Sequence, residues 1–174
     1  GFTDSAQLDK DGNRIGDSYG FYYQDLPSNP MVGDFAMKGS DFVKDVLSIK
    51  NVILNVSSVV FDRKALLEVF ERSGSEVRAY RMAGDWRLYS ELLADESAKV
   101  VYSGTPDNLH RRHAVSVTHS LAAKRHLDEI RQVQGYIAGR MGLSELQCEH
   151  AKRYLDEVTA QLLDAVEDRQ EEAH

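Results

Sequence analysis

The sequence has little cysteine and proline, and it lacks long hydrophobic stretches. Of its 174 residues, one is cysteine (Cys148) and three are proline. A single cysteine excludes an internal disulfide and a cysteine-rich zinc site. Its longest apolar runs, such as residues 52–54 and 59–61, are far too short to cross a bilayer. We therefore expect a protein of a reducing compartment, the cytoplasm, with no transmembrane segment.

Positive charge is also scarce. The chain has 21 lysines and arginines against 28 aspartates and glutamates, which gives a net charge of −7. This balance argues against a general nucleic-acid or anionic-membrane binder. Hydrophobic residues make up 42% and charged residues 28%, which are the proportions of a globular domain. The glycine-rich phosphate loops and the Gly-x-Ser-x-Gly nucleophile turn are absent.

The first residue is glycine, and Phe2 and Thr3 already have strand character without a lead-in. We therefore expect the chain to be a piece of a longer polypeptide, with part of any active site preceding it.

Strand and helix patterns alternate over residues 1–119. In order, we expect a hairpin with its turn at 9–13, a loop over 20–34, a helix over 40–47, extended segments over 52–54 and 56–61, a helix from Asp62 to Gly74, a helix beginning at Asp85, and a strand over 99–102 followed by a turn at Pro106. In the loop, one or two of the aromatic residues at 21–23 are expected in the core. Such alternation predicts an α/β fold with a mixed sheet and flanking helices.

Residues 120–174 form a second region with no proline and a helical pattern throughout. Two apolar stripes are present: Leu121, Leu127, Ile130, Val133 and Ile137, then Leu155, Val158, Leu162 and Val166. Between them, Ser144 and Gln147 have the spacing of a capping box. We predict a helical hairpin that extends the first region.

The densest polar cluster is Asn-Leu-His-Arg-Arg-His, which ends at His113. Arginine binds phosphate with two parallel hydrogen bonds, and histidine can bind a metal ion. A solvated basic turn is an equally good interpretation of this spacing.

A second cluster surrounds Asp85, which follows a glycine and precedes Trp86, the one tryptophan. A carboxylate at a helix start beside an aromatic ring suits a sugar site. The simpler alternative is that Asp85 is an ordinary N-cap residue.

Together these motifs resemble the C-terminal half of family-two, GT-A-type inverting glycosyltransferases, which use nucleotide-activated sugars. The resemblance rests on the strand at 56–61, the Ala-Gly-Asp-Trp-Arg-Leu-Tyr helix start around Asp85, the strand at 99–102, Pro106, and the block from His110 through His113 to Ser-Val. It covers roughly residues 1–130. The family's nucleotide-binding half, with its Asp-x-Asp motif, would precede residue 1.

The resemblance implies a role for each motif residue. Asp85 matches the general base, and Trp86 lies beside it as a candidate substrate contact. Arg111 and Arg112 match part of the clamp on the donor diphosphate, and His113 matches a residue that helps to hold a divalent metal, Mg or Mn. The implied partners are a nucleotide-sugar donor and a glycan or lipid-linked acceptor, as in polysaccharide biosynthesis. Gly84 departs from the family, because many members have a second acidic residue there.

The leading hypothesis is thus the acceptor-side portion of a glycosyltransferase (1–119) followed by a helical hairpin (120–174). The alternative is a non-catalytic α/β interaction module whose hairpin binds a partner. A metal hydrolase built on His110 and His113 ranks last, because it lacks a nearby carboxylate ligand. We expect the chain alone to be inactive and to self-associate, as a homodimer for example, through an unpaired sheet edge and the second apolar stripe.

Overall fold

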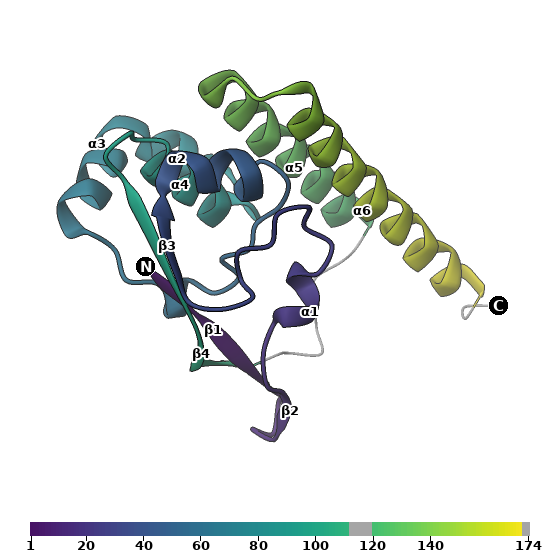
Figure 1. Ribbon diagram of the computed structural model, residues 1–174. Helices are drawn as coiled ribbons and strands as arrows, with labels where there is room; N and C mark the ends of the chain where they lie inside the picture. Colours follow the sequence, from purple (N-terminus) through teal and green to yellow (C-terminus); the bar gives the residue numbers. More distant parts are fainter. Residues whose placement is uncertain (112–119, 172–174) are drawn as a thin grey trace.

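A curled, four-stranded mixed sheet forms the base of the molecule, with most of the helices packed on one of its faces (Figure 1). The computed structural model describes residues 1–111 and 120–171. The strand order is β2-β1-β4-β3, formed by β1 (Phe2–Leu8), β2 (Arg14–Gly16), β3 (Phe35–Lys38) and β4 (Lys99–Arg111). Strands β1 and β4 are parallel, and the other two pairs are antiparallel. The predicted α/β class with a mixed sheet is confirmed, whereas the likeness to GT-A enzymes remains a prediction.

The β1–β2 hairpin has the predicted turn. Asp9 Oδ1 accepts the backbone N–H groups of Asp11 (2.9 Å) and Asn13 (2.8 Å). Gly12 has a φ of 90°, a conformation that glycine adopts without strain. The turn is therefore encoded locally, by one side chain and one glycine.

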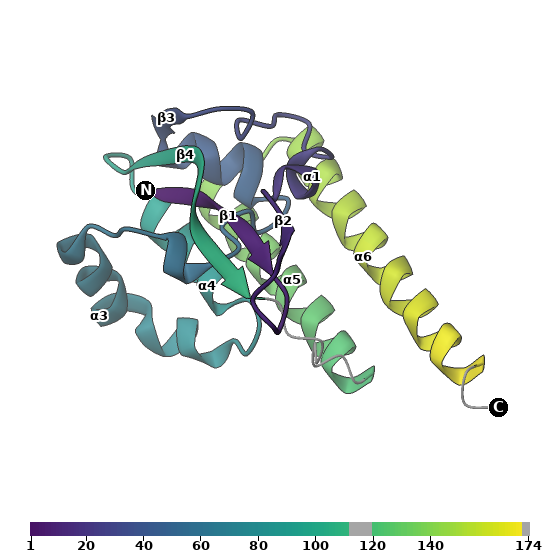
Figure 2. The ribbon, with the colours of Figure 1, turned by 90° about the horizontal axis from the view of Figure 1, so that it is seen from below.

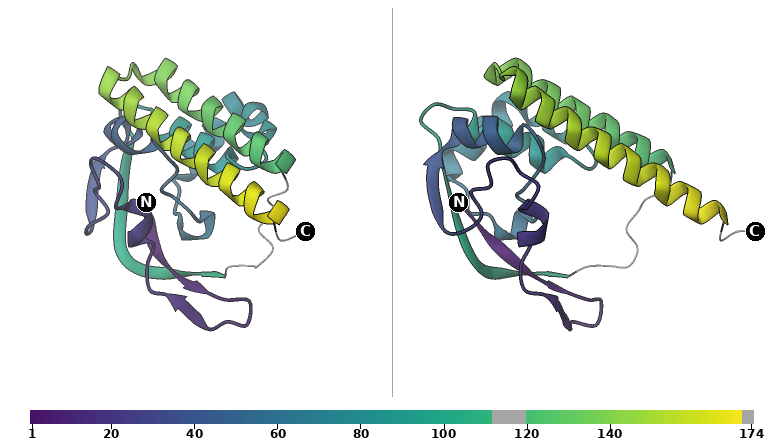
Figure 3. Two further views of the ribbon diagram at one scale, coloured as in Figure 1. Left: turned by 90° about the vertical axis from the view of Figure 1, so that its right-hand side faces the viewer. Right: turned by 45° about the vertical axis from the view of Figure 1, so that its right-hand side comes forward.

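Strand β4 does not end in a turn at Pro106, as predicted, but continues past it. Thr3 of β1 pairs with Ser103, whereas Ser5 pairs with Asn108. The extra residues of β4 form a bulge that contains Pro106, where no ladder hydrogen bond has to be donated. Figure 3 shows the strand turning sharply along its length. Because of this bulge, β4 bends and belongs to both halves of the curled sheet.

The segment before the first long helix also differs from its prediction. Instead of a strand over 56–61, Val56–Ser58 form a turn of 3₁₀ helix, and Val59 makes one isolated antiparallel bridge to Phe2. Asp62 then caps α3 (Arg63–Ala79) as predicted, by accepting the N–H of Ala65 at 2.9 Å. The helix runs through Gly74, which is buried, rather than ending there. Contacts with other parts of the chain, rather than local strand or helix propensity, decided the structure at residues 56–61 and at Gly74.

Two segments before α3 complete the layer on the sheet. Residues 39–47 are helical as predicted, in α2 (Gly39–Phe42) and a continuing π-helical turn (Val43–Leu47). The loop over 20–34 contains one short helix, α1 (Gly20–Tyr23), in which Tyr23 is buried and Phe21 is 59% exposed. This agrees with the expectation that one or two of the three aromatic residues lie in the core.

The predicted helical hairpin is confirmed. Helix α5 (Ser120–Met141) and helix α6 (Glu145–Glu171) lie side by side (Figures 1 and 3). Gln147 donates its backbone N–H to Ser144 Oγ (3.3 Å), and Ser144 donates its own to Gln147 Oε1 (2.9 Å), which is the predicted capping box. The inner face of α5 (Ile130, Val133 and Ile137) belongs to the same hydrophobic cluster as Phe42 and Leu47. The hairpin therefore shares the core of the α/β region.

Figure 2 shows α5 and α6 lying beside this layer when the molecule is viewed from below. Of the helices that the structure describes, none combines the length and the apolar character needed to cross a membrane.

Candidate functional site

Asp85 lies in the first turn of α4 (Gly84–Leu93) and is not its N-cap residue. The N-cap position is Ala83, which has no side chain able to cap the helix. Asp85 Oδ1 instead accepts the N–H of its neighbour Trp86 at 2.7 Å. The simpler interpretation of Asp85 as an ordinary N-cap is therefore wrong, and its carboxylate needs another explanation.

The Asp85 side chain is half-buried, and its carboxylate has few partners. Its Oδ2 atom has one side-chain neighbour, the amide nitrogen of Asn51, at 3.4 Å. Within residues 1–111 and 120–171, no cationic side chain forms an ion pair with it. Burial raises the pKa of the carboxyl above its ordinary value of 3.8, and the bonds from Trp86 and Asn51 oppose that shift only in part. A desolvated carboxylate without a counter-charge is typical of a proton acceptor.

Trp86 lies in the core. Its side chain is 3% exposed, and its Nε1–H donates to the backbone carbonyl of Leu47 at 2.8 Å. The structure therefore places the predicted sugar-contacting ring behind Asp85, where it supports α4 against the helical turn at 43–47. Packing explains why position 84 is glycine, because a Cβ there would lie 3.1 Å from the carbonyl oxygen of Val77 at the end of α3.

A polar segment leads from Asp85 to the middle of the parallel strands. It begins at Asn51, beside Asp85, and four residues later Asn55 donates its amide N–H to Ser5 Oγ at 3.1 Å. Asn108 of β4 donates to the same Ser5 oxygen at 2.9 Å and accepts from Ser57 Oγ at 3.1 Å. These uncharged groups form one connected set of hydrogen bonds at the middle of β1 and β4.

The cluster at the end of β4 is divided between two faces of the strand. His110 is half-buried and shares a hydrogen bond of 2.5 Å between its Nδ1 atom and the Tyr19 hydroxyl. Arg111 is exposed, as is Leu109, so their side chains alternate with His110 across the strand. No contact between Arg111 and Asp85 occurs in the described part of the chain. Arg112 and His113 lie outside the described residues.

A divalent metal has no built site in the part of the chain that the structure describes. Within 1–111 and 120–171, no three histidine, cysteine, aspartate or glutamate side chains come together as a set of metal ligands. The predicted metal residue, His113, lies outside those residues. We therefore derive no chemical step through a metal ion.

Two residues near Asp85 were missed by the sequence analysis. Asn51 carries no recognisable motif, and only the tertiary structure brings it to Asp85. Glu129 of α5 accepts hydrogen bonds from the backbone just before α4. Glu129 could have been found, because it lies four residues before Val133 on the apolar stripe and so carries a charge on a face that must be buried.

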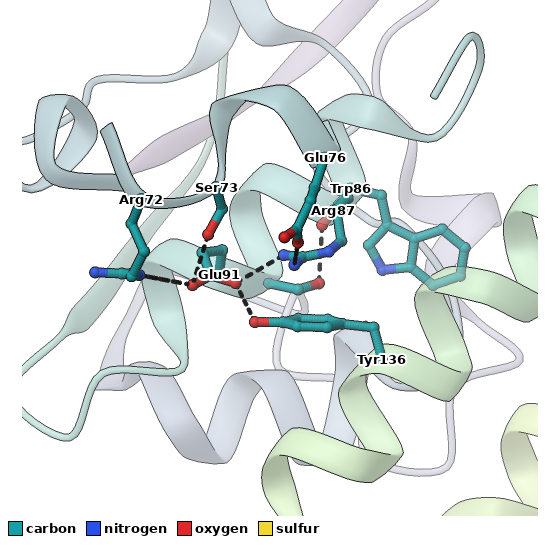
Figure 4. A network of polar contacts seen from close by, with 8 residues as sticks. Arg72, Ser73, Glu76, Trp86, Arg87, Glu91 and Tyr136 are labelled. Carbon is teal, nitrogen blue, oxygen red and sulfur yellow. Dashed lines mark hydrogen bonds and ion pairs between the residues drawn. The ribbon is translucent and has the colours of Figure 1, made fainter. Parts of the chain in front are cut away.

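Helix α4 is also fixed at its middle by a buried charged network (Figure 4). Glu91, 5% exposed, accepts from Arg87 (2.8 Å) and from Arg72 of α3 (3.0 Å), and Tyr136 of α5 donates its hydroxyl to it. The guanidinium of Arg87 lies 3.3 Å from the centre of the Tyr136 ring. Burial alone would raise the pKa of Glu91, but these bonds lower it to about 2. The network joins α3, α4 and α5.

A cavity of about 400 Å³ lies on the far side of Tyr89, between α3, α4 and residues 59–62. Charged side chains such as Asp62, Arg72 and Glu91 line it beside apolar ones, and Asp85 is not among the lining residues. The Tyr89 hydroxyl is buried and has no hydrogen-bond partner among the described residues. We assign the candidate site to Asp85 rather than to this cavity, because the carboxylate supplies the chemistry and the cavity does not contain it.

Comparison of the chain with protein-family models, with curated proteins and with solved structures found no match.

Proposed function

We propose that this chain is the acceptor-side portion of an inverting glycosyltransferase, in which Asp85 is the general base. The observation that carries the proposal is the state of the Asp85 carboxylate. It is half-buried, its pKa is raised by that burial, and its side-chain hydrogen bond within the described chain comes from one amide nitrogen at 3.4 Å. A base that must accept a proton is best left without a strong counter-charge, because a cation would hold it in the ionised form.

The proposed reaction is a single displacement at the anomeric carbon of a nucleotide sugar. The acceptor hydroxyl gives its proton to Asp85 as its oxygen forms a bond to the anomeric carbon. The bond from that carbon to the diphosphate breaks, and its electron pair leaves with the nucleotide diphosphate. Attack opposite the leaving group inverts the configuration. The transition state resembles an oxocarbenium ion, as it does in glycoside hydrolysis.

The other residues of the site have supporting roles in this proposal. Asn51 orients the carboxylate, and Trp86 anchors the first turn of α4 from behind. Arg111, with the fork geometry that suits a diphosphate, is proposed to contribute to donor binding from the end of β4. The nucleobase site and the metal carboxylates are assigned to a preceding part of the polypeptide, as the resemblance implies.

The test is transfer activity in the full polypeptide that contains this chain. Donors with UDP, GDP and dTDP leaving groups would be supplied with soluble glycan acceptors, and release of the nucleotide diphosphate would be measured. Asp85→Asn should lower the transfer rate by about 10²–10⁴-fold, the usual contribution of a positioned base, and leave donor affinity nearly unchanged.

Asp41→Asn is the matched control, because Asp41 is an exposed aspartate in the first turn of another helix, α2. It should transfer at the wild-type rate. An Asp85→Asn protein within a few-fold of wild type would reject the assignment of the base. Absence of nucleotide release with every donor would instead favour the non-catalytic interaction module.

A further inference from the structure

We propose that Glu129, on helix α5 of the hairpin, is a positioning residue for Asp85. The hairpin is then a working part of the candidate site, although it lies largely outside the resemblance. What Asp85 does depends on the proposed function, but the positioning of its carboxylate by Glu129 does not.

The Glu129 carboxylate holds the turn from which α4 begins. Its Oε1 atom accepts the N–H of Arg81 at 2.9 Å, and its Oε2 atom accepts those of Met82 at 2.7 Å and Ala83 at 2.9 Å. Ala83 is the N-cap residue of α4 and has no capping side chain of its own. A carboxylate from a distant helix thus satisfies the backbone donors of the turn that leads into α4. Asp85 follows Ala83 by two residues.

Full ionisation makes this contact strong. Glu129 is 5% exposed, and an ion this buried is stable only when it is well hydrogen-bonded. Burial alone would raise the pKa of Glu129, but the three backbone N–H groups, with help from Arg125, lower it. Of the neighbouring titratable groups, His126 on α5 and Tyr80 before the turn both sense the Glu129 charge. The pKa shifts of His126 and Tyr80 both favour their neutral forms, and the three backbone N–H groups hold the Glu129 carboxylate.

Helix α5 also fixes the backbone segment that leads to Asn51, the side-chain partner of Asp85. Gln134 of α5 donates its amide N–H groups to the carbonyl oxygens of Ile49 and Ala151, each at 2.9 Å. Ile49 precedes Asn51 by two residues, and Asn51 is the side-chain neighbour of Asp85. One face of α5 therefore fixes both backbone segments whose side chains meet at Asp85. The relation between Asp85 and Asn51 depends on the hairpin being in place.

The ionisation of Asp85 distinguishes positioning from a purely structural role. Glu129→Gln should act on the Asp85 pKa through the turn. A loosened turn lets water reach the Asp85 carboxylate, and burial is the main cause of its raised pKa. The pKa of Asp85 should therefore fall toward its ordinary value of 3.8. Simple loss of global stability would leave the Asp85 titration in the folded protein where it was.

The experiment is an NMR titration of the Asp85 side-chain carboxyl carbon in the 174-residue chain, together with amide hydrogen exchange. In Glu129→Gln we expect the Asp85 midpoint to fall, and the Arg81, Met82 and Ala83 amides to exchange roughly tenfold faster or more, as expected when charge-assisted hydrogen bonds are lost. Asp128→Asn is the control, because Asp128 is a half-exposed acidic residue next to Glu129 that pairs with Arg131 on the same helix. It should change neither measurement. An Asp85 midpoint that is the same in both variants would overturn the proposal.

If Glu129→Gln does not fold, the wild-type chain still decides the question. The amide protons of residues 81–83 should shift with the titration of the Glu129 carboxyl, and the Asp85 carbon should show an inflection in the same pH range. Independent titration of the two carboxyls would overturn the positioning role. Failure of the proposed function would be seen in a different experiment, in which the Asp85→Asn protein transfers sugar at the wild-type rate. That result would not change the titration of Asp85 in the wild-type chain.

Discussion

The indole nitrogen of Trp86 donates its hydrogen to the backbone carbonyl of Leu47 across 2.8 Å, and this bond joins the first turn of α4 to the end of the helical turn at 43–47. Both residues are buried, at 3% and 0% exposure. Asp85 directly precedes Trp86 in the chain, and Asn51 follows Leu47 by four residues. The geometry of the candidate site is therefore set from inside the core.

Trp86→Phe should weaken the fold without weakening donor binding. It keeps most of the ring volume but leaves the Leu47 carbonyl buried without its donor, which costs about 1–3 kcal/mol. Chemical unfolding followed by tyrosine fluorescence would measure the loss. Strongly reduced nucleotide-sugar affinity at unchanged stability would contradict the core position and return Trp86 to the binding surface.

Asp85→Asn should raise the melting temperature at neutral pH. The folded-state pKa of Asp85 is raised by burial, so ionisation disfavours the folded state, and stability from this group is present below 3.8 and lost as pH rises through the folded value. Thermal unfolding at pH 7 should therefore favour the variant, and the difference should vanish near about pH 3, where both side chains are neutral. An equal melting temperature at pH 7 would show that the carboxylate is not desolvated.

Glu91→Gln should destabilise the fold by about 3 kcal/mol, because the buried Arg87 guanidinium loses the nearer and more buried of the two carboxylates that pair with it in the described chain, and keeps Glu76 at 3.3 Å. The wild-type pKa of Glu91 is lowered from 4.5 to about 2, so its contribution is complete above 4.5 and disappears as pH falls toward 2. Urea unfolding from neutral to acidic pH should show the gap between variant and wild type closing. Glu96→Gln, at an exposed position after α4, is the control and should show no gap.

Asp25→Asn should destabilise the protein at least as much as Lys50→Met, although Asp25 is the exposed member of their ion pair. Lys50 is 2% exposed and donates to the carbonyl of Tyr22 at 2.5 Å, whereas the Asp25 side chain is 53% exposed. Asp25→Asn leaves the buried ammonium without its counter-charge, which costs about 3 kcal/mol. Lys50→Met leaves the Tyr22 carbonyl without its donor, at about 1–3 kcal/mol, while water hydrates the exposed Asp25 carboxylate. A clearly larger loss for Lys50→Met in urea unfolding would refute this order.

Arg111→Ala should weaken binding of the nucleotide diphosphate in the full polypeptide and leave stability almost unchanged, because the side chain is exposed at the end of β4. We expect roughly a tenfold loss of affinity by calorimetry, the order of one charge-assisted hydrogen bond. Arg153→Ala, on the exposed face of α6, serves as the comparison and should bind like wild type. Identical affinities of the two variants would remove Arg111 from the donor site.

Local patterns in the sequence determined most of the helices. The stripe Ile130, Val133 and Ile137 predicts a helix face without reference to any other part of the chain, and the structure buries that face. Asp62 and the Ser144–Gln147 pair predicted helix starts for the same reason, because a cap is formed within one turn.

Strands were predicted less well. Residues 56–61 are rich in β-branched side chains, yet the structure gives one bridge there, between Val59 and Phe2. Extended structure depends on a neighbouring strand, which the local sequence does not contain. Strand β4 was longer than predicted because β1, about a hundred residues earlier, offers it a parallel partner.

For the candidate site, the sequence by itself determined the residue types: a helix-opening aspartate, a tryptophan beside it, and a basic cluster after a strand. Only the tertiary structure decided what surrounds them. It turned Trp86 into the core, left Asp85 with Asn51 as its side-chain neighbour, and brought Glu129 to the turn before α4. The physical reason is that desolvation and hydrogen bonding depend on which groups meet in space. Asn51, Asp85 and Glu129 lie far apart along the chain, and the fold brings Asn51 to Asp85 and Glu129 to the turn just before it.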